Sequence, residues 1–67
     1  MKFSTRLKEL RTEKNLSQRQ LAEAIGVRQP TIARWEAGFF EPSASDVVML
    51  AKFFGVTTDY ILGLNDF

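Results

Sequence analysis

The sequence contains neither cysteine nor histidine. It therefore cannot form a disulfide framework or a Cys/His zinc site, which are the usual supports of very small domains. It also lacks the most frequent general base, histidine, and the cysteine nucleophile. Its four glycines form no phosphate-cradling loop, and its carboxylates have no spacing typical of catalysis or metal binding. We therefore expect no enzymatic activity, no cofactor, no metal and no evident small-molecule ligand.

Long apolar runs are absent as well. No stretch approaches the roughly 20 apolar residues of a membrane span, and the first residues do not lead into the apolar core of a signal peptide. We expect a cytoplasmic protein with no membrane partner. A chain of 67 residues has room for a single domain, residues 1–67, without linker or repeat. Its small core must come from packed helices.

Charge is unevenly distributed along the chain. Residues 1–34 hold eight basic and three acidic side chains, a net charge of +5, whereas residues 35–67 hold one basic and five acidic side chains, a net charge of −4. Such asymmetry is typical of a nucleic-acid-binding face, although ordinary solvated charges explain it equally well when it is taken alone.

Apolar residues recur at helical spacing, and no segment of four residues alternates as a strand would. Asn15 ends the first periodic segment, and each of the other four ends before a glycine, the residue that most easily adopts the left-handed conformation beyond a helix. We predict an all-α fold with five helices, at residues 4–14, 18–25, about 29–37, 44–54 and 58–62. Phe3, Leu7 and Leu10 form the apolar stripe of the first helix.

Capping signals mark the starts of these helices. Ser17 and Gln20 have the spacing of a capping box. Ser43 is the expected cap of the fourth helix, with Asp46 placed near the positive end of its dipole. Either Thr57 or Thr58 caps the last helix. The helix starts are therefore predicted from local chemistry alone.

Residues 18–37 contain every element of a helix-turn-helix. Ala22 is the small residue that allows two helices to cross closely, and Gly26 allows a tight turn between them. The apolar anchors of the two helices are Leu21, Ile25, Val27, Ile32 and Trp35. Each feature is common alone, but the set within 20 residues is specific.

The chain resembles the phage-repressor and Cro-like helix-turn-helix family, also called the XRE family. The matching stretches are RLKELRTEKNLSQRQLAEAIGV, QPTIARWEAG, EPS and LAKFFGVTTDYILGL, which together cover nearly the whole chain. The resemblance implies a compact, lambda-repressor-like domain of five helices. It also implies binding to operator DNA, usually as a dimer, and commonly repression of transcription.

The third helix is expected to read bases. On a helical wheel, Pro30, Ala33, Arg34 and Ala37 face outward, a small-sided face with one long cation. Arg34 suits guanine, Pro30 or Ala33 suits a thymine methyl group, and Gln29 suits an adenine edge. The resemblance implies base reading by the same Gln29, Pro30 and Arg34. Taken singly, however, these residues are also typical of helix starts and of ordinary protein surfaces.

A second set of residues is expected to contact phosphates or to position the reading helix. Gln18 lies at the start of the second helix, where free N–H groups attract phosphate, and the resemblance implies that it also braces Gln29. The whole set is Ser17, Gln18, Arg19, Arg28, Thr31, Arg11 and Lys14, with Lys2 or Arg6 as a further candidate. Any of the cations could equally be solvated. The resemblance also implies a structural ion pair between Arg11 and Glu36.

Two positions depart from the family pattern. Residues 37–41, AGFFE, hold no cation where relatives often grip phosphate, and Phe39 and Phe40 are hard to bury together in a loop. At least one of them is a candidate for a partner contact. Arg28 replaces the usual capping serine at the start of the third helix, a loss that is tolerable if its guanidinium meets DNA.

The second half of the chain is the candidate dimer surface. Its core is expected from Val47, Leu50, Ala51, Phe54, Val56 and Leu62. Further apolar residues then remain, namely Met49, Phe53, Tyr60 and Phe67. In a two-fold homodimer the reading helices would lie roughly 34 Å apart on a palindromic operator of double-stranded DNA. The alternative is an interaction module of the antitoxin or anti-repressor type, which holds a protein partner through Phe39 and Phe40.

Overall fold

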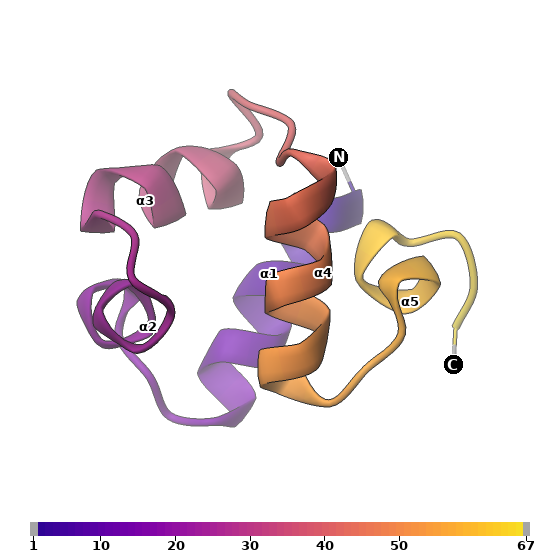
Figure 1. Ribbon diagram of the computed structural model, residues 1–67, viewed down its shortest axis with the longest axis horizontal. Helices are drawn as coiled ribbons and strands as arrows, with labels where there is room; N and C mark the ends of the chain where they lie inside the picture. The colour runs from indigo at the N-terminus through magenta and orange to yellow at the C-terminus, as the bar shows by residue number, and fades with distance from the viewer. Residues whose placement is uncertain (1, 67) are drawn as a thin grey trace.

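The structure, a computed structural model, describes residues 2–66, and within them it contains five helices and no strand. The helices are α1 (Lys2–Glu13), α2 (Gln18–Ile25), α3 (Gln29–Ala37), α4 (Ala44–Phe54) and α5 (Thr58–Leu62). In Figure 1, α1 runs behind α4 through the middle of the molecule, with α2 and α3 on one side and α5 on the other. The predicted all-α fold is confirmed.

The helix starts follow the capping signals of the sequence. Ser17 and Gln20 form a reciprocal capping box, Ser43 and Asp46 form another, and Thr57 accepts a hydrogen bond from the N–H of Tyr60. These contacts satisfy backbone N–H groups that have no partner inside the helix. Three helices therefore begin where their capping signals predict, and α3 also begins at its predicted residue, Gln29, although without a side-chain cap.

The first helix differs from its predicted span of residues 4–14. It begins at Lys2, because Phe3 and Ser4 are buried and Phe3 lies on the same buried stripe of the helix as Leu7 and Leu10. It ends at Glu13, because Asn15 adopts a left-handed conformation with φ 58° and draws Lys14 into the closing turn. Asn tolerates this conformation better than most residues.

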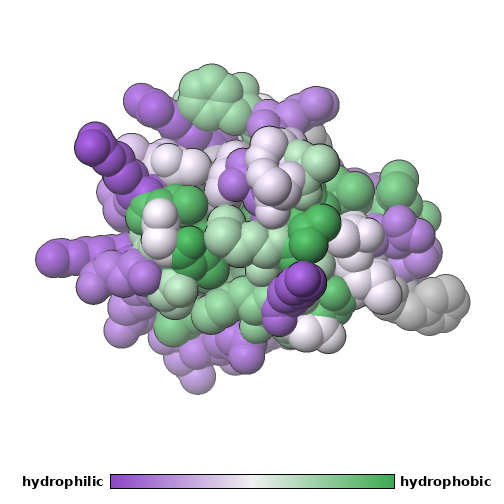
Figure 2. Space-filling model, viewed as in Figure 1, coloured by the Kyte–Doolittle hydropathy of each residue, from purple (hydrophilic) through white to green (hydrophobic). Residues whose placement is uncertain are grey.

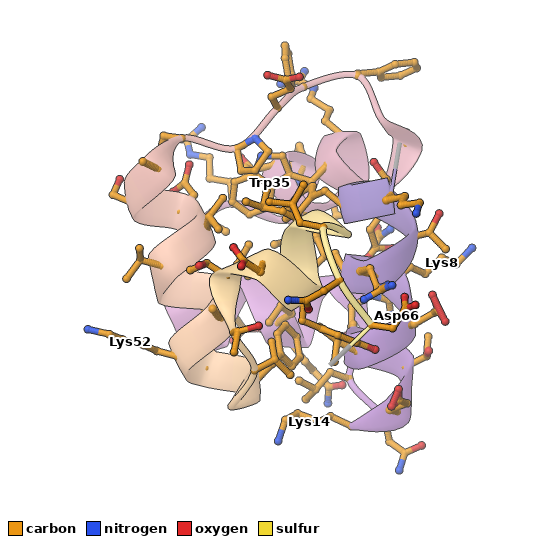
Figure 3. The ribbon with its side chains drawn as sticks, turned by 90° about the vertical axis from the view of Figure 1, so that its right-hand side faces the viewer. Lys8, Lys14, Trp35, Lys52 and Asp66 are labelled. Carbon is orange, nitrogen blue, oxygen red and sulfur yellow. The ribbon has the colours of Figure 1, made fainter. Side chains whose placement is uncertain are left out.

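The core is assembled around α1. Phe3 and Trp35 meet edge to face, with ring centroids 6.2 Å apart, and Figure 3 shows Trp35 directed into the molecule while Lys8, Lys14 and Lys52 point outward. Among residues 2–66 the buried apolar residues are Phe3, Leu7, Leu10, Leu21, Ala22, Ile32, Trp35, Val47, Leu50, Ala51 and Ile61. Phe54 and Val56 pack against this core from partly buried positions.

The prediction that Leu62 fills the core is wrong. Ile61 is fully buried, whereas Leu62 is 36% exposed. Because consecutive helical residues are rotated by about 100°, only one of these two neighbours can face α1. A helix of five residues contains too little periodicity for the sequence to distinguish them.

Arg6 ties the end of the chain to α1. Its Nη1 donates to the backbone oxygens of Tyr60 (2.9 Å) and Asn65 (3.1 Å), and its Nη2 lies 2.8 Å from Oδ1 of Asp66. The guanidinium also lies 4.2 Å from the centre of the Tyr60 ring. Figure 3 shows Asp66 beside α1. Arg6 therefore closes the fold, which corrects its assignment as a candidate phosphate contact.

No helix among residues 2–66 is long and apolar enough to cross a bilayer.

Candidate DNA interface

Helices α2 and α3 form the helix-turn-helix that the sequence predicts. Gly26 ends α2 in a left-handed conformation with φ 76°, which a side chain would strain, and its N–H donates to the backbone oxygen of Ala22. The N–H of Val27 donates to the same oxygen at 3.0 Å. Ala22 is buried at the crossing, and Leu21 and Ile32 are fully buried beside it. The two helices are thus held as one unit.

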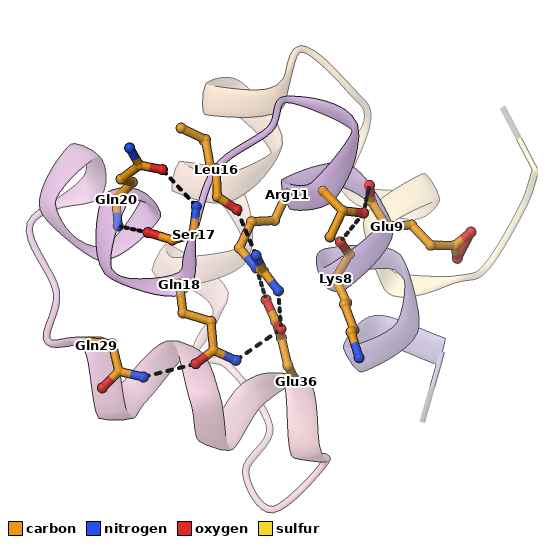
Figure 4. A network of polar contacts seen from close by, with 10 residues as sticks. Lys8, Glu9, Arg11, Leu16, Ser17, Gln18, Gln20, Gln29 and Glu36 are labelled. Atoms are coloured by element: carbon orange, nitrogen blue, oxygen red, sulfur yellow. Dashed lines mark hydrogen bonds and ion pairs between the residues drawn. The ribbon is translucent and has the colours of Figure 1, made fainter.

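A chain of side-chain hydrogen bonds links the start of α3 to α1 (Figure 4). Nε2 of Gln29 donates to Oε1 of Gln18 at 2.8 Å, and Nε2 of Gln18 donates to Oε1 of Glu36 at 3.2 Å. Arg11 then donates to both carboxylate oxygens of Glu36, over 2.6 Å from Nε and 3.0 Å from Nη2. The ion pair implied by the resemblance is therefore present, and Gln18 joins it to Gln29.

The direction of these bonds fixes both amide groups. The carboxylate of Glu36 only accepts hydrogen bonds, so Gln18 must turn its NH₂ toward Glu36 and its oxygen toward Gln29. Gln29 must then use one N–H for Gln18. Figure 4 shows the oxygen of Gln29 on the side away from Gln18, and its second N–H is left over by the network. They provide the adjacent donor and acceptor that match N7 and N6 of adenine.

The guanidinium of Arg11 makes its hydrogen bonds inside the protein. Its Nη1 also donates to the backbone oxygen of Leu16 at 2.6 Å, and its side chain is only 11% exposed. Hydrogen bonding to Glu36 raises the pKa of Arg11, with a smaller opposing effect of burial, so the guanidinium remains charged. These contacts favour the structural assignment of Arg11 over the phosphate contact.

The outer face of α3 matches the helical wheel in most positions. Gln29, Pro30, Arg34 and Ala37 are exposed. Ala33 and Thr31 are half-buried, so Ala33 is less prominent on this face than predicted. Arg28 occupies the N-cap position of α3 without a side-chain cap, as the sequence indicates.

An open groove of about 960 Å³ lies between the starts of α2 and α3. It brings together the predicted positioning residues except Lys14 and Thr31. Of the predicted base readers, Gln29 and Pro30 line it, whereas Ala33 and Arg34 lie outside it. The groove is lined by Arg11, Ser17, Gln18, Arg19, Ala22, Glu23, Val27, Arg28, Gln29 and Pro30. Figure 2 shows hydrophilic side chains projecting over the α2 and α3 side of the molecule.

The basic side chains differ in their exposure and in their contacts with acidic and aromatic side chains. Arg19 lies 3.5 Å from Glu23, and both side chains are mostly exposed, so this pair contributes little. Lys14 is exposed and its Nζ lies 6.0 Å from the centre of the Phe53 ring. Two other basic residues of the first half are paired with acidic residues of the second half, Arg6 with Asp66 and Arg11 with Glu36. Part of the charge asymmetry is therefore neutralised within the fold.

The loop after α3 contains a contact that the sequence did not indicate. Phe39 is 78% exposed and Phe40 is 52% exposed, and Figure 2 shows hydrophobic surface over this loop. The guanidinium carbon of Arg34 lies 5.6 Å from the centre of the Phe40 ring. No local pattern reveals such a contact between a helix and the loop that follows it.

The side chains of the candidate dimer surface differ in their exposure, and the surface itself stays a prediction. Phe53 and Tyr60 pack against the core, and Met49 is half-buried. Besides Phe39 and Phe40, the exposed large apolar side chains of residues 35–66 are Val48, Leu62 and Leu64. Phe67 lies outside the described residues.

Comparisons with known proteins agree with this geometry. A family model described as helix-turn-helix matches residues 7–61. The chain is 44% identical to the HTH-type transcriptional activator BcrR of Enterococcus faecalis over 92% of its length, and 41% identical to the cryptic phage CTXphi transcriptional repressor RstR of Vibrio cholerae over 81%. It spans only 30% and 49% of the lengths of these two relatives.

A solved structure extends the likeness to three dimensions. The P22 c2 repressor, crystallised in complex with a synthetic operator, superposes with a TM-score of 0.84 at 24% identity. The superposition covers 91% of this chain and 92% of the repressor chain. At this level of identity the likeness is one of fold. With the family match over residues 7–61, it leads to one assignment: the chain belongs to the helix-turn-helix family of the phage-repressor and Cro-like type, the XRE family.

Proposed function

We propose that the chain binds double-stranded DNA in a sequence-specific manner, as the DNA-binding part of a transcriptional regulator, by inserting α3 into the major groove. The observation that carries this proposal is the orientation of Gln29. Its amide is fixed by Gln18 at 2.8 Å, so one donor and one acceptor face outward from the exposed start of α3. A preorganised amide binds an adenine edge without a further loss of rotamer freedom.

Three other residues of α3 complete the reading surface. Arg34 binds O6 and N7 of a guanine through its guanidinium fork, and Pro30 contacts a thymine methyl group. Ala33, which is half-buried, lets the helix approach the bases closely. Discrimination at each base pair is then expected to come mainly from Gln29 and Arg34.

Phosphates are bound at the starts of the two helices. The free N–H groups at the start of α2 attract one phosphate beside Gln18 and Ser17, and Arg19 and Arg28 reach others from either side of the groove. Lys14 and Thr31 are the outlying members of this set, and Arg11 acts mainly through Glu36. Each cation that binds a phosphate releases counterions and adds to the salt dependence.

The regulator acts as a homodimer on a palindromic operator, most simply as a repressor. A single α3 reads too few base pairs for a unique site, and a two-fold dimer doubles the number. RstR, at 41% identity, is named a repressor, whereas BcrR is named an activator. Repression requires only occupancy of the operator, so the domain described here suffices for it.

The experiment is selection of randomised duplex DNA by the purified chain, followed by binding of the selected duplex at two salt concentrations. We expect enrichment of a palindromic site and a steep loss of affinity in salt. Gln29→Ala should relax the preference at one base pair in each half-site. Weak binding without enrichment, abolished by salt, would contradict the proposal.

One observation favours a second function. The side chain of Phe39 is 78% exposed, and an aromatic ring in that position is typical of an anchor for a protein partner. An interaction module would use this loop and show no enrichment in the selection. The same experiment therefore separates the two functions.

A further inference from the structure

Phe40 lies against the side chain that we expect to read guanine. The guanidinium carbon of Arg34 is 5.6 Å from the centre of the Phe40 ring, within the range of a cation–π contact. The backbone fixes this proximity. The N–H groups of Gly38 and Phe39 both donate to the backbone oxygen of Arg34, the latter at 3.1 Å. The loop that carries Phe40 is thus tied to the residue its ring contacts.

Arg34 has few other restraints. Among residues 2–66 the ion pairs are made by Arg6, Arg11 and Arg19, and no hydrogen bond involves the guanidinium of Arg34. A long exposed arginine samples many rotamers, and these must be restricted when its fork binds a base. A ring beside the guanidinium favours a subset of the rotamers before DNA arrives.

The two aromatic residues of the loop are not equivalent. Phe39 is 78% exposed, and the aromatic contacts of the described residues do not include it, whereas Phe40 is 52% exposed and faces Arg34. Residues 37–41 contain no cation that could grip a phosphate. The contact that the structure gives Phe40 is with the guanidinium of Arg34, so an effect of its ring on DNA binding is expected to pass through that arginine.

We propose that Phe40 is a positioning residue that orients the guanidinium of Arg34 toward the base pair it reads, and so sets specificity at that pair. The proposal rests on the proposed function, in which Arg34 reads a base. A cation–π contact of this exposure corresponds to about a two- to fivefold change in a binding constant. The effect should be confined to one base pair of each half-site.

The test uses Phe40→Leu, which keeps an apolar side chain without a ring, with Phe40→Tyr as the conservative variant and Phe39→Leu as the matched control. Arg34→Ala first identifies the base pair that Arg34 reads, as the position at which discrimination is lost. Phe40→Leu should lower discrimination at that pair about two- to fivefold and leave the other pairs unchanged. Phe40→Tyr should restore it, and Phe39→Leu should have no effect. In an Arg34→Ala background, Phe40→Leu should change nothing further.

A second measurement reports the contact without DNA. In the NMR spectrum of the free protein, the ring current of Phe40 should shift the Hδ signals of Arg34 upfield, and Phe40→Leu but not Phe39→Leu should remove the shift. If the wild type shows no sequence preference while the shift is present, the proposed function fails and specificity setting by Phe40 fails with it, although the contact stands. If the wild type selects a site but Phe40→Leu behaves like Phe39→Leu, or if the shift is absent, positioning by Phe40 is overturned while the proposed function survives.

Discussion

Arg11 holds Glu36 by two hydrogen bonds across the interior of the molecule, with Nε 2.6 Å from Oε2 and Nη2 3.0 Å from Oε1. The side chains are only 11% and 4% exposed, so the pair joins α1 to the end of α3 away from bulk water. The same carboxylate also accepts the bond from Gln18. Stability of the fold and orientation of the Gln29 amide are therefore both expected to depend on the same carboxylate.

Breaking this pair should destabilise the domain strongly. Arg11→Met leaves the carboxylate of Glu36 buried without an opposite charge, and Glu36→Met leaves the guanidinium of Arg11 buried without one. Each substitution should lower the free energy of unfolding by about 3–5 kcal/mol. The double variant should lose less than the sum of the two single variants, because no charge remains unpaired. Urea unfolding of the wild type, the two single variants and the double variant measures the coupling energy between the two residues. Additive losses would show that the two charges do not stabilise each other.

Gln18→Ala should reduce base discrimination by releasing the amide of Gln29. Gln29→Ala should cost about 1–3 kcal/mol on the preferred site, and Gln18→Ala should lower discrimination at the same base pair. Because both act through one amide orientation, the double variant should lose less than the sum. Binding titrations on the selected site and on a site altered at that pair give the discrimination of the wild type, of the two single variants and of the double variant. Loss at a different base pair in Gln18→Ala would contradict the link between the two glutamines.

Much of the fold follows from local chemistry in the sequence. Ser17 with Gln20 predicts the start of α2 through a capping box, and Ser43 predicts the start of α4 as its cap. Both starts are found, and Asp46 completes a second capping box with Ser43. The outward face of α3 follows from the burial of Ile32 and Trp35 alone.

Contacts between distant residues could not be predicted in this way. Arg6 binds two backbone oxygens and Asp66 near the opposite end of the chain, and a bond to a backbone oxygen leaves no signal in the side-chain pattern. The sequence therefore suggested a free cation at Arg6. Similarly, the bond from Gln18 to Glu36 depends on how α2 crosses α3.

Arg19→Ala and Arg28→Ala should each weaken binding to all duplexes by similar factors. Each removes one proposed phosphate contact, and the loss of such a contact should reduce the slope of log K against log salt by about one unit. Lys52→Ala is the matched control, since Lys52 is exposed on α4 and points outward (Figure 3). Titrations at four salt concentrations give the slopes. An unchanged slope would remove that arginine from the phosphate-binding set.

Ser4→Ala should stabilise the protein. The hydroxyl of Ser4 is buried and has no hydrogen-bond partner among the described residues. Removing an unsatisfied polar group and improving helix propensity should together raise the free energy of unfolding by about 1 kcal/mol. Thr5→Ala, an exposed position on the same helix, controls for propensity alone. Equal effects of the two substitutions in thermal unfolding would mean that the buried hydroxyl carries no penalty.

Gly63→Ala should destabilise the fold more than Gly55→Ala, although both glycines end helices at positive φ, 78° and 69°. Alanine in the left-handed conformation costs about 1–2 kcal/mol at either position. At Gly55 an added Cβ meets nothing within 4 Å, whereas at Gly63 it would lie 2.4 Å from Cβ of Lys2. This overlap should cost roughly 1–3 kcal/mol more, measured as the difference between the two variants in urea unfolding.

The overlap at Gly63 involves the Cβ of Lys2, which cannot rotate away because it is fixed to the backbone of α1. Lys2→Gly in the Gly63→Ala background should therefore recover the additional loss, while the same change with Gly55→Ala should not. If Gly63→Ala lowers the free energy of unfolding no more than Gly55→Ala does, the start of α1 does not pack against the end of α5. The contacts of Arg6 with residues 60, 65 and 66 would then be what joins this segment to α1. Recovery would instead establish that the first and last turns of the fold stabilise each other by direct backbone approach.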